Sequence, residues 1–237
     1  MKRAFVCIAC LVITQSIFAQ KNILNQVQNV ISGNGAGLSN DEIVKGLKEA
    51  LKVGTNNSTS RASQLDGYYK NPKIKIPFPQ EAKNMEQQLR ALGMTKEVDK
   101  FIKTLNRAAE DAAKSAVPVF VDAITKMTIT DGVNILKGNN DAATNFLKNT
   151  SSAGLLAAFK PIVKNSLSKV EVTKYWKPLV KTYNQIPLVK KQNPNLDEYV
   201  TLKAIEGLFK LIAEEELKIR KDPAARVNDI LKKVFGK

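Results

Sequence analysis

The 237-residue sequence contains no histidine, and its only two cysteines, Cys7 and Cys10, lie near the amino terminus. Without histidine, Ser-His-Asp and Cys-His catalysis are excluded, and so are the usual zinc sites and the side chain best suited to proton transfer near neutral pH. Catalysis by carboxylate, lysine or tyrosine stays open. We therefore expect no metal and no cofactor, and we favour a non-enzymatic role.

The first residues have the pattern of a secretory signal peptide. Lys2 and Arg3 precede a mostly apolar run that continues to Phe18, and Ala19 precedes Gln20. This order predicts a cleavable signal at 1–19 and a periplasmic or secreted protein. A lipoprotein signal acylated at Cys10 is disfavoured because apolar residues continue past that position.

No long apolar stretch follows the signal, so no transmembrane segment is expected in the mature chain. Because both cysteines lie within 1–19, that chain has no disulfide and no thiol chemistry.

The formal net charge is +15, and +13 without Lys2 and Arg3. Such a chain is attracted to anionic surfaces. For an exported protein these are anionic lipid, lipopolysaccharide or cell-wall polymer, and no nucleic acid partner is expected. The alternative is that the lysines only keep a helical protein soluble.

Apolar residues recur at spacings of three and four along most of the mature chain, and no alternating strand pattern is present. The sequence predicts a short helix and a glycine-rich linker at 20–38, then a single all-α domain of about ten helices at 39–237. Ser39 and Glu42 form a capping box that starts the first helix of this domain. Residues 141–148 and 152–170 are predicted as two separate helices.

A long alanine-rich segment at 95–127 is the expected centre of the domain. Its small residues would let neighbouring helices approach closely. Pro118 interrupts the pattern, so we expect either a kink near Lys114 or two consecutive helices. Pro161 and Pro178 also fall inside predicted helices. Kinked helices of this kind can surround a pocket, although each proline can instead mark the first turn of a new helix.

Residues 66–79 contain three prolines and cannot form a continuous helix. Ile74, Ile76 and Phe78 alternate with more exposed residue types, which predicts an extended strap packed on one side. A strap of this kind can gate a cavity beneath it.

Two groups of residues are candidate sites. Asn106, Arg107 and Glu110 lie one turn apart beside the alanine seam and form a candidate polar site, with surface ion pairs as the alternative. The second group is the densest basic-aromatic cluster of the chain, a candidate surface for an anionic headgroup or sugar, with a solvated helix face as the alternative. Its members are Lys174, Tyr175, Trp176, Lys177 and Lys181.

The sequence resembles an exported bacterial family catalogued as domain of unknown function number 4197, from about Leu38 to Phe235. The resemblance is carried by residues 46–55, 74–77, 105–110, 123–128, 135–138, 174–176 and 222–226. It implies a secreted or periplasmic helical domain and supplies no activity. The polar members of these stretches serve a site or tie helices together: Asn106, Arg107, Glu110 and Arg226.

Three functions follow from these observations. The first is a non-enzymatic envelope protein that binds an apolar or anionic ligand, or a partner, between kinked helices. The second is a structural or interaction protein that uses its basic face. The third is a histidine-free, carboxylate-dependent hydrolase or lyase that uses Glu110, Asp111 or Arg107.

Overall fold

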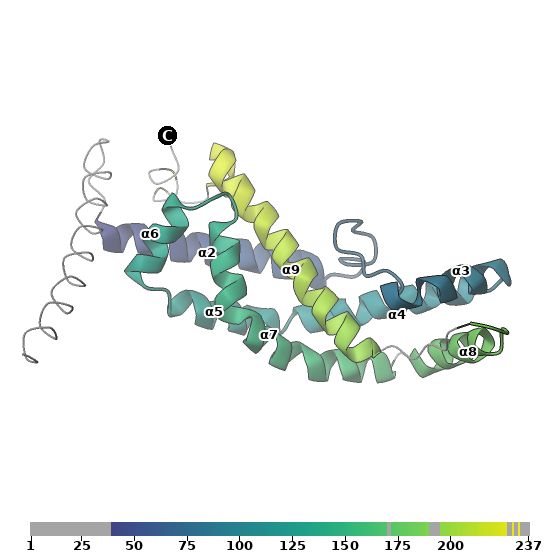
Figure 1. Cartoon of the computed structure of the whole chain (residues 1–237). Helices are drawn as coiled ribbons and strands as arrows, with labels where there is room; N and C mark the ends of the chain where they lie inside the picture. Colours follow the sequence, from purple (N-terminus) through teal and green to yellow (C-terminus); the bar gives the residue numbers. More distant parts are fainter. Residues whose placement is uncertain (1–38, 170–171, 190–194, 227–228, 230–231, 233–237) are drawn as a thin grey trace, which may run out of the picture.

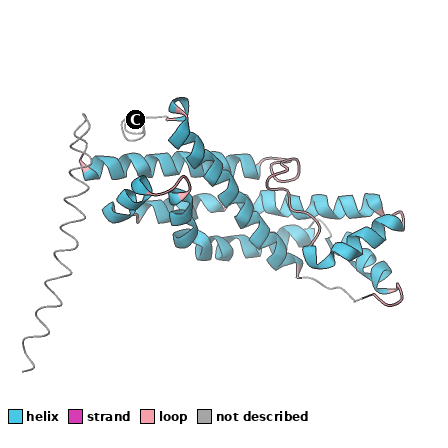
Figure 2. Cartoon of the chain, turned by 45° about the horizontal axis from the view of Figure 1, so that its top comes forward, coloured by secondary structure: helices cyan, strands magenta, loops and turns pink. Residues whose placement is uncertain are grey.

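The computed structural model describes residues 39–169, 172–189, 195–226, 229 and 232. The predicted signal peptide and the helix and linker at 20–38 lie outside this part of the chain. The described residues form a single all-α domain with eight α-helices, two short 3₁₀ helices and no strand (Figures 1 and 2). The predicted total of about ten helices is not confirmed, because the first predicted helix and most of the last one fall outside the described ranges.

The first described helix, α2, spans Asn40–Ser63. The predicted capping box at its start is confirmed. The Ser39 hydroxyl accepts a hydrogen bond from the Glu42 amide at 3.2 Å, and the Glu42 carboxylate accepts one from the Ser39 amide at 2.8 Å. These bonds satisfy backbone donors that have no partner inside the helix.

The alanine-rich centre consists of two consecutive helices, α4 at Thr95–Ala113 and α5 at Ala116–Thr125, as one of the two alternatives predicted. Pro118 is the third residue of α5. In this first turn the N–H group that proline lacks would have no partner inside the helix. The alanines of the seam are fully buried, and α7 and α9 both pack against α4. These alanines are Ala108, Ala109, Ala112, Ala113 and Ala116.

Helix α6 spans Ile129–Lys137 and begins with a second capping box, between Thr128 and Asp131. The next helix, α7, runs unbroken over Ala142–Lys169. The prediction of two helices in this region was wrong. The residues between them include no glycine or proline, and the hydroxyls of Thr150, Ser151 and Ser152 donate to carbonyl groups one turn earlier in the same helix. The helix therefore continues through them.

The remaining elements are η1 at Gln80–Ala82, α3 at Lys83–Ala91, α8 at Val172–Asn184, α9 at Leu196–Lys221 and η2 at Pro223–Ala225. Helices α3 and α8 lie beside α4 at one end of an elongated molecule, and α2, α5 and α6 lie toward the other (Figure 1). Helix α9 crosses the molecule obliquely and packs against α2, α4 and α7. Most buried apolar side chains belong to one continuous core.

No helix in the described ranges has both the length and the apolar character needed to cross a bilayer. This agrees with the prediction of a mature chain without a transmembrane segment.

Substitutions at two glycines, Gly207 and Gly54, would test how closely α9 packs against its neighbours. A Cβ atom on Gly207 would lie 2.7 Å from Cε1 of the buried Tyr68, whereas a Cβ atom on Gly54 would meet only Cβ of Glu215 at 3.8 Å. Gly207→Ala should lower the free energy of unfolding by about 1–3 kcal/mol through overpacking. Gly54→Ala should raise it by roughly 0.5–1 kcal/mol through helix propensity. Urea unfolding of both variants measures this, and effects of the same sign would contradict the packing.

Candidate functional site

Residues 64–79 form the non-helical connection between α2 and η1, called here the 64–79 connection. It turns sharply at its start, where Asp66 has φ +68° and a Cβ atom on Gly67 would lie 2.3 Å from the Arg61 carbonyl oxygen. Later in the segment Ile74, Ile76 and Phe78 are buried, and the residues between them are exposed. A role as a strap over a cavity stays a prediction.

Asn106 binds the connection to α4. Its Oδ1 accepts a hydrogen bond from the Ile76 amide, and its Nδ2 donates to the carbonyl groups of Ile76 and Ile102, each at 2.8 Å. Asn106 is completely buried, and it pairs both backbone groups of Ile76 as a neighbouring strand would. Both N–H donors of the Asn106 amide are used in these bonds, so this side chain has no donor left for a ligand.

Glu110, one turn further along α4, binds the start of the connection. Its Oε1 accepts from the amides of Tyr68 and Tyr69 at 3.1 and 3.2 Å, and its Oε2 accepts from Arg107. Arg107 also pairs with Asp66, whose second oxygen accepts from Lys70. The side chain of Glu110 is 5% exposed, so this carboxylate is buried with a cation and two amide donors around it. A buried charge needs such partners.

The ionisation of this cluster follows from its contacts. Hydrogen bonds from Lys70 and Arg107 lower the pKa of Asp66 to about 2. Burial opposes the charged guanidinium of Arg107, but its bonds to Asp66 and Glu110 outweigh burial and raise its pKa. Burial, with a smaller contribution from the Glu110 charge, raises the pKa of Tyr68 far above its usual range. Asp66 and Arg107 are therefore charged at neutral pH, and the Tyr68 hydroxyl is neutral.

The far side of the connection is bound to α9. The Tyr68 hydroxyl donates to the Ala204 carbonyl oxygen at 2.6 Å, and the Tyr199 hydroxyl donates to that of Pro77 at 3.1 Å. The structure thus brings Asn106, Arg107 and Glu110 together, as predicted, around backbone groups of the connection. The arrangement ties helices to a non-helical segment, and both oxygens of the buried carboxylate accept hydrogen bonds within the protein.

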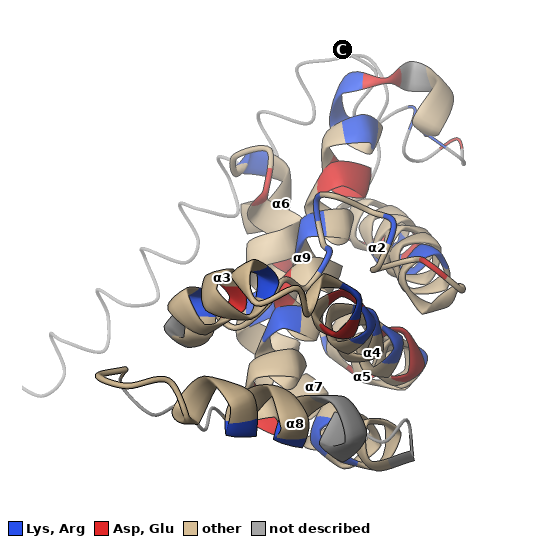
Figure 3. Ribbon diagram, turned by 90° about the vertical axis from the view of Figure 1, so that its right-hand side faces the viewer, with Lys and Arg blue, Asp and Glu red and all other residues tan. Residues whose placement is uncertain are grey.

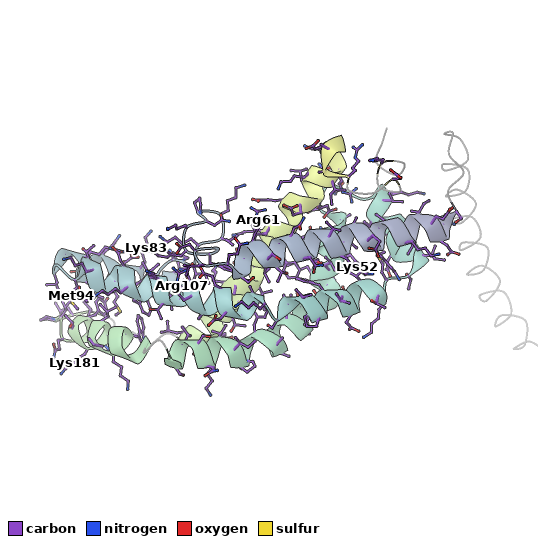
Figure 4. The ribbon with its side chains drawn as sticks, turned by 180° about the vertical axis from the view of Figure 1, so that it is seen from behind. Lys52, Arg61, Lys83, Met94, Arg107 and Lys181 are labelled. Atoms are coloured by element: carbon purple, nitrogen blue, oxygen red, sulfur yellow. The ribbon has the colours of Figure 1, made fainter. Side chains whose placement is uncertain are left out.

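The sequence analysis missed Asp66 and Tyr68, the partners of this cluster from the connection. The turn residues Asp66-Gly67 and the two following tyrosines were visible, but no local pattern indicated that they meet α4, about 40 positions later. In Figure 4 Arg107 lies on α4 close to the connection.

Arg226 lies apart from this cluster. Its Nε and Nη2 donate to the carbonyl groups of Ile219 and Arg220, both at 3.1 Å, at the carboxyl end of α9. Arg226 therefore caps a helix whose last carbonyl groups have no helical partner. Of the two roles that the family resemblance allowed, this contact matches tying segments together.

A second buried carboxylate, Glu216 of α9, also went unpredicted. It accepts hydrogen bonds from the amides of Ala143 and Thr144 at the start of α7, and it pairs with Arg220. A small, largely apolar cavity of about 30 Å³ lies beside it, between α2 and α9. That volume accommodates one or two water molecules and no lipid.

The described members of the predicted basic-aromatic surface do not share one surface in the structure. Trp176 is only 8% exposed, with its ring stacked on Phe101 at 4.8 Å and 5.9 Å from that of Phe78. Placing Trp176 on a surface was therefore wrong: α8 packs against α4, and burial of a large aromatic ring between the two helices is favourable. Lys177 and Lys181 are exposed. The side chains of Lys174 and Tyr175 lie outside the described part.

No three His, Cys, Asp or Glu side chains gather into a metal-binding group within the described ranges. The carboxylates of Glu110 and Glu216 are buried, and each pairs with an arginine.

Comparison with known proteins identifies the family. The model of the family described as "Protein of unknown function (DUF4197)" matches residues 37–236, so the chain belongs to this family. Neither the curated proteins nor the solved structures gave a match.

Loss of the Asn106 side chain should release the 64–79 connection. Asn106→Ala leaves the two backbone groups of Ile76 buried without partners, at about 1–3 kcal/mol for each unpaired group. We expect faster tryptic cleavage after the exposed Lys70, Lys73 or Lys75 and a lower free energy of unfolding. Asn165→Ala, which truncates an exposed amide on α7, is the control. Equal cleavage rates in the two variants would disprove the role of Asn106.

Asp66 should make stability pH-dependent in acid. Its folded pKa of about 2 lies below its unfolded value of about 3.9. Between these values the unfolded chain binds more protons, so its contribution is present above about pH 4 and is lost as pH falls toward 2. In urea unfolding across this range, Asp66→Asn should flatten the slope and Lys70→Ala should flatten it less. An unchanged slope in Asp66→Asn would contradict the ion pairs.

Proposed function

We propose that this protein is an exported, non-enzymatic binding protein of the cell envelope that docks on an anionic component through a lysine row on α8. The row consists of Lys174, Lys177 and Lys181, whose spacing of three and four places them on one face of the helix. The observation that carries the proposal is that the described members of this row, Lys177 and Lys181, are exposed and have no ion-pair partner among the described residues.

The surrounding sequence strengthens this charge. Residues 172–191 contain five lysines and no acidic residue. In Figure 3 the lysine bands of α8 follow its outer edge, away from the rest of the molecule. A row of like charges with no internal partner is repulsive within the chain, and an anionic partner relieves that repulsion.

Several lysines elsewhere have an acidic partner, whereas others, such as the exposed Lys160 and Lys164 on α7, have no ion-pair partner among the described residues either. On α9, Lys203 and Lys210 both pair with Glu206, and Lys218 pairs with Glu215. In the 64–79 connection, Lys70 and Lys73 have acidic partners as well. Residues 172–191 differ from α9 and the 64–79 connection because they contain no acidic residue that could compensate their lysines.

The other two hypotheses have less support. The cavity beside Glu216 is too small for an apolar ligand. The carboxylate of Glu110 is held by two backbone amides and Arg107, which suits attachment of the connection better than proton transfer. The cavity beside Glu216 and the contacts of Glu110 therefore give no support to ligand binding or catalysis at these two places, and we propose binding through the surface.

Neutralising the row should weaken binding to a polyanion. A lysine near an anionic surface contributes about 1 kcal/mol, so Lys177→Gln with Lys181→Gln should reduce affinity for immobilised heparin roughly 10–30-fold. The charge-matched control is Lys160→Gln with Lys164→Gln, two exposed lysines one turn apart on α7. Affinity should also fall with added salt. If both double variants lose affinity equally, net charge alone acts and the α8 row is not the site.

A further inference from the structure

We propose that the anionic component is a phospholipid bilayer, and that the loop after α8 inserts Leu188 into its interfacial region beside the lysine row. This inference rests on the proposed function and names the partner of the same site. It depends on an observation that is independent of the lysines: Leu188 is fully exposed and has an unusual backbone conformation.

The loop is built to project Leu188. After α8 ends at Asn184, the amide of Ile186 donates to the Tyr183 carbonyl oxygen at 3.0 Å and closes a turn. Ile186 and Val189 pack against the core, whereas Leu188 between them is fully exposed. Ile186 and Val189 therefore attach the loop to the core, and the side chain of Leu188 extends into solvent between them.

The backbone at Leu188 has φ +66°. This left-handed region is uncommon for residues other than glycine, asparagine and aspartate, because Cβ crowds the backbone. Leu188 thus has two unfavourable properties at once, an exposed apolar side chain and a crowded backbone. Residues held in such sparsely populated backbone regions cluster at functional sites and ligand contacts.

The turn after α3, at the same end of the molecule, also combines an exposed leucine with a positive backbone φ angle. Leu92, at the end of α3, is 56% exposed, and it is followed by Gly93 with φ +84°. Figure 4 places Met94 of this turn and Lys181 of α8 at the same end of the molecule. Two exposed leucines and the unpaired lysines of α8 therefore share one end, while the ion-paired lysines of α9 lie mostly along the body.

A bilayer fits both chemistries together. Its headgroups attract the lysines, and its acyl boundary takes up the leucine side chains a few ångströms deeper. A soluble anionic polymer pairs with the lysines but has no apolar layer for Leu188. Insertion of single leucines cannot anchor a protein without charge attraction, so binding should require phosphatidylglycerol in the membrane and should be reversible by salt.

The test compares two leucine-to-serine variants, which change no charge. Leu188→Ser should weaken sedimentation with phosphatidylglycerol-containing vesicles about tenfold, because the buried apolar area is lost. Leu65→Ser should bind as the wild type does, since Leu65 is 78% exposed in the 64–79 connection, away from α8. Both variants should bind heparin with unchanged affinity, and the emission of the buried Trp176 verifies that each is folded.

Insertion is read out directly with Leu188→Trp. Its emission, after subtraction of the Trp176 signal of the wild type, should shift to the blue with these vesicles and be quenched by lipids brominated in their acyl chains. Leu65→Trp should show neither change. Surface adsorption alone would leave the residue-188 emission unquenched and would overturn the inference.

The two proposals fail in different ways. Unchanged vesicle binding by Leu188→Ser would overturn insertion and leave adsorption of the α8 row to the membrane surface. Heparin binding without any vesicle binding by the wild type would also overturn insertion and leave a polymer as partner of the α8 row. Unchanged heparin binding after loss of Lys177 and Lys181 would overturn the proposed function itself.

Discussion

The fold depends on the need to pair the backbone groups of a non-helical segment that crosses a helical core. A helix satisfies its own amides and carbonyls, but the turns within residues 64–79 pair only some of the backbone groups of that segment, and buried groups that stay unpaired need other partners. The side chains of α4 replace the missing partners. Asn106 pairs with both backbone groups of Ile76, and Glu110 accepts from two successive amides.

The same constraint explains why charged residues lie inside an apolar core. Glu110 accepts hydrogen bonds from two amides and a guanidinium, and the burial of its carboxylate requires partners such as Arg107. Arg107 in turn needs Asp66, which starts the connection. Each member therefore stabilises the next. Removing one leaves a buried group without a partner, so the cluster behaves as a unit and a catalytic role is not needed to explain it.

Local patterns predicted those parts of the fold that depend on local physics. The capping box at Ser39, the end of a helix before Pro118 and the all-α class follow from rules that act within one or two turns. The tertiary partners do not follow from such rules. Trp176 was predicted on a surface because lysines surround it in sequence, but its indole turns inward onto Phe101. Likewise the site residues Asn106, Arg107 and Glu110 were identified, whereas Asp66 and Tyr68 were not, since nothing near them in sequence indicates α4.

The hydrogen bond from Tyr68 to Ala204 joins residues 136 positions apart. A chain that leaves a ribosome or a translocation channel amino-terminus first presents α2, the connection and α4 well before α9. During that interval Tyr68 has no acceptor from α9, and Gly207 does not yet cover its ring. The last long helix thus closes a structure that the first two hundred residues cannot complete, and maturation of the domain is set by the arrival of its carboxyl-terminal part.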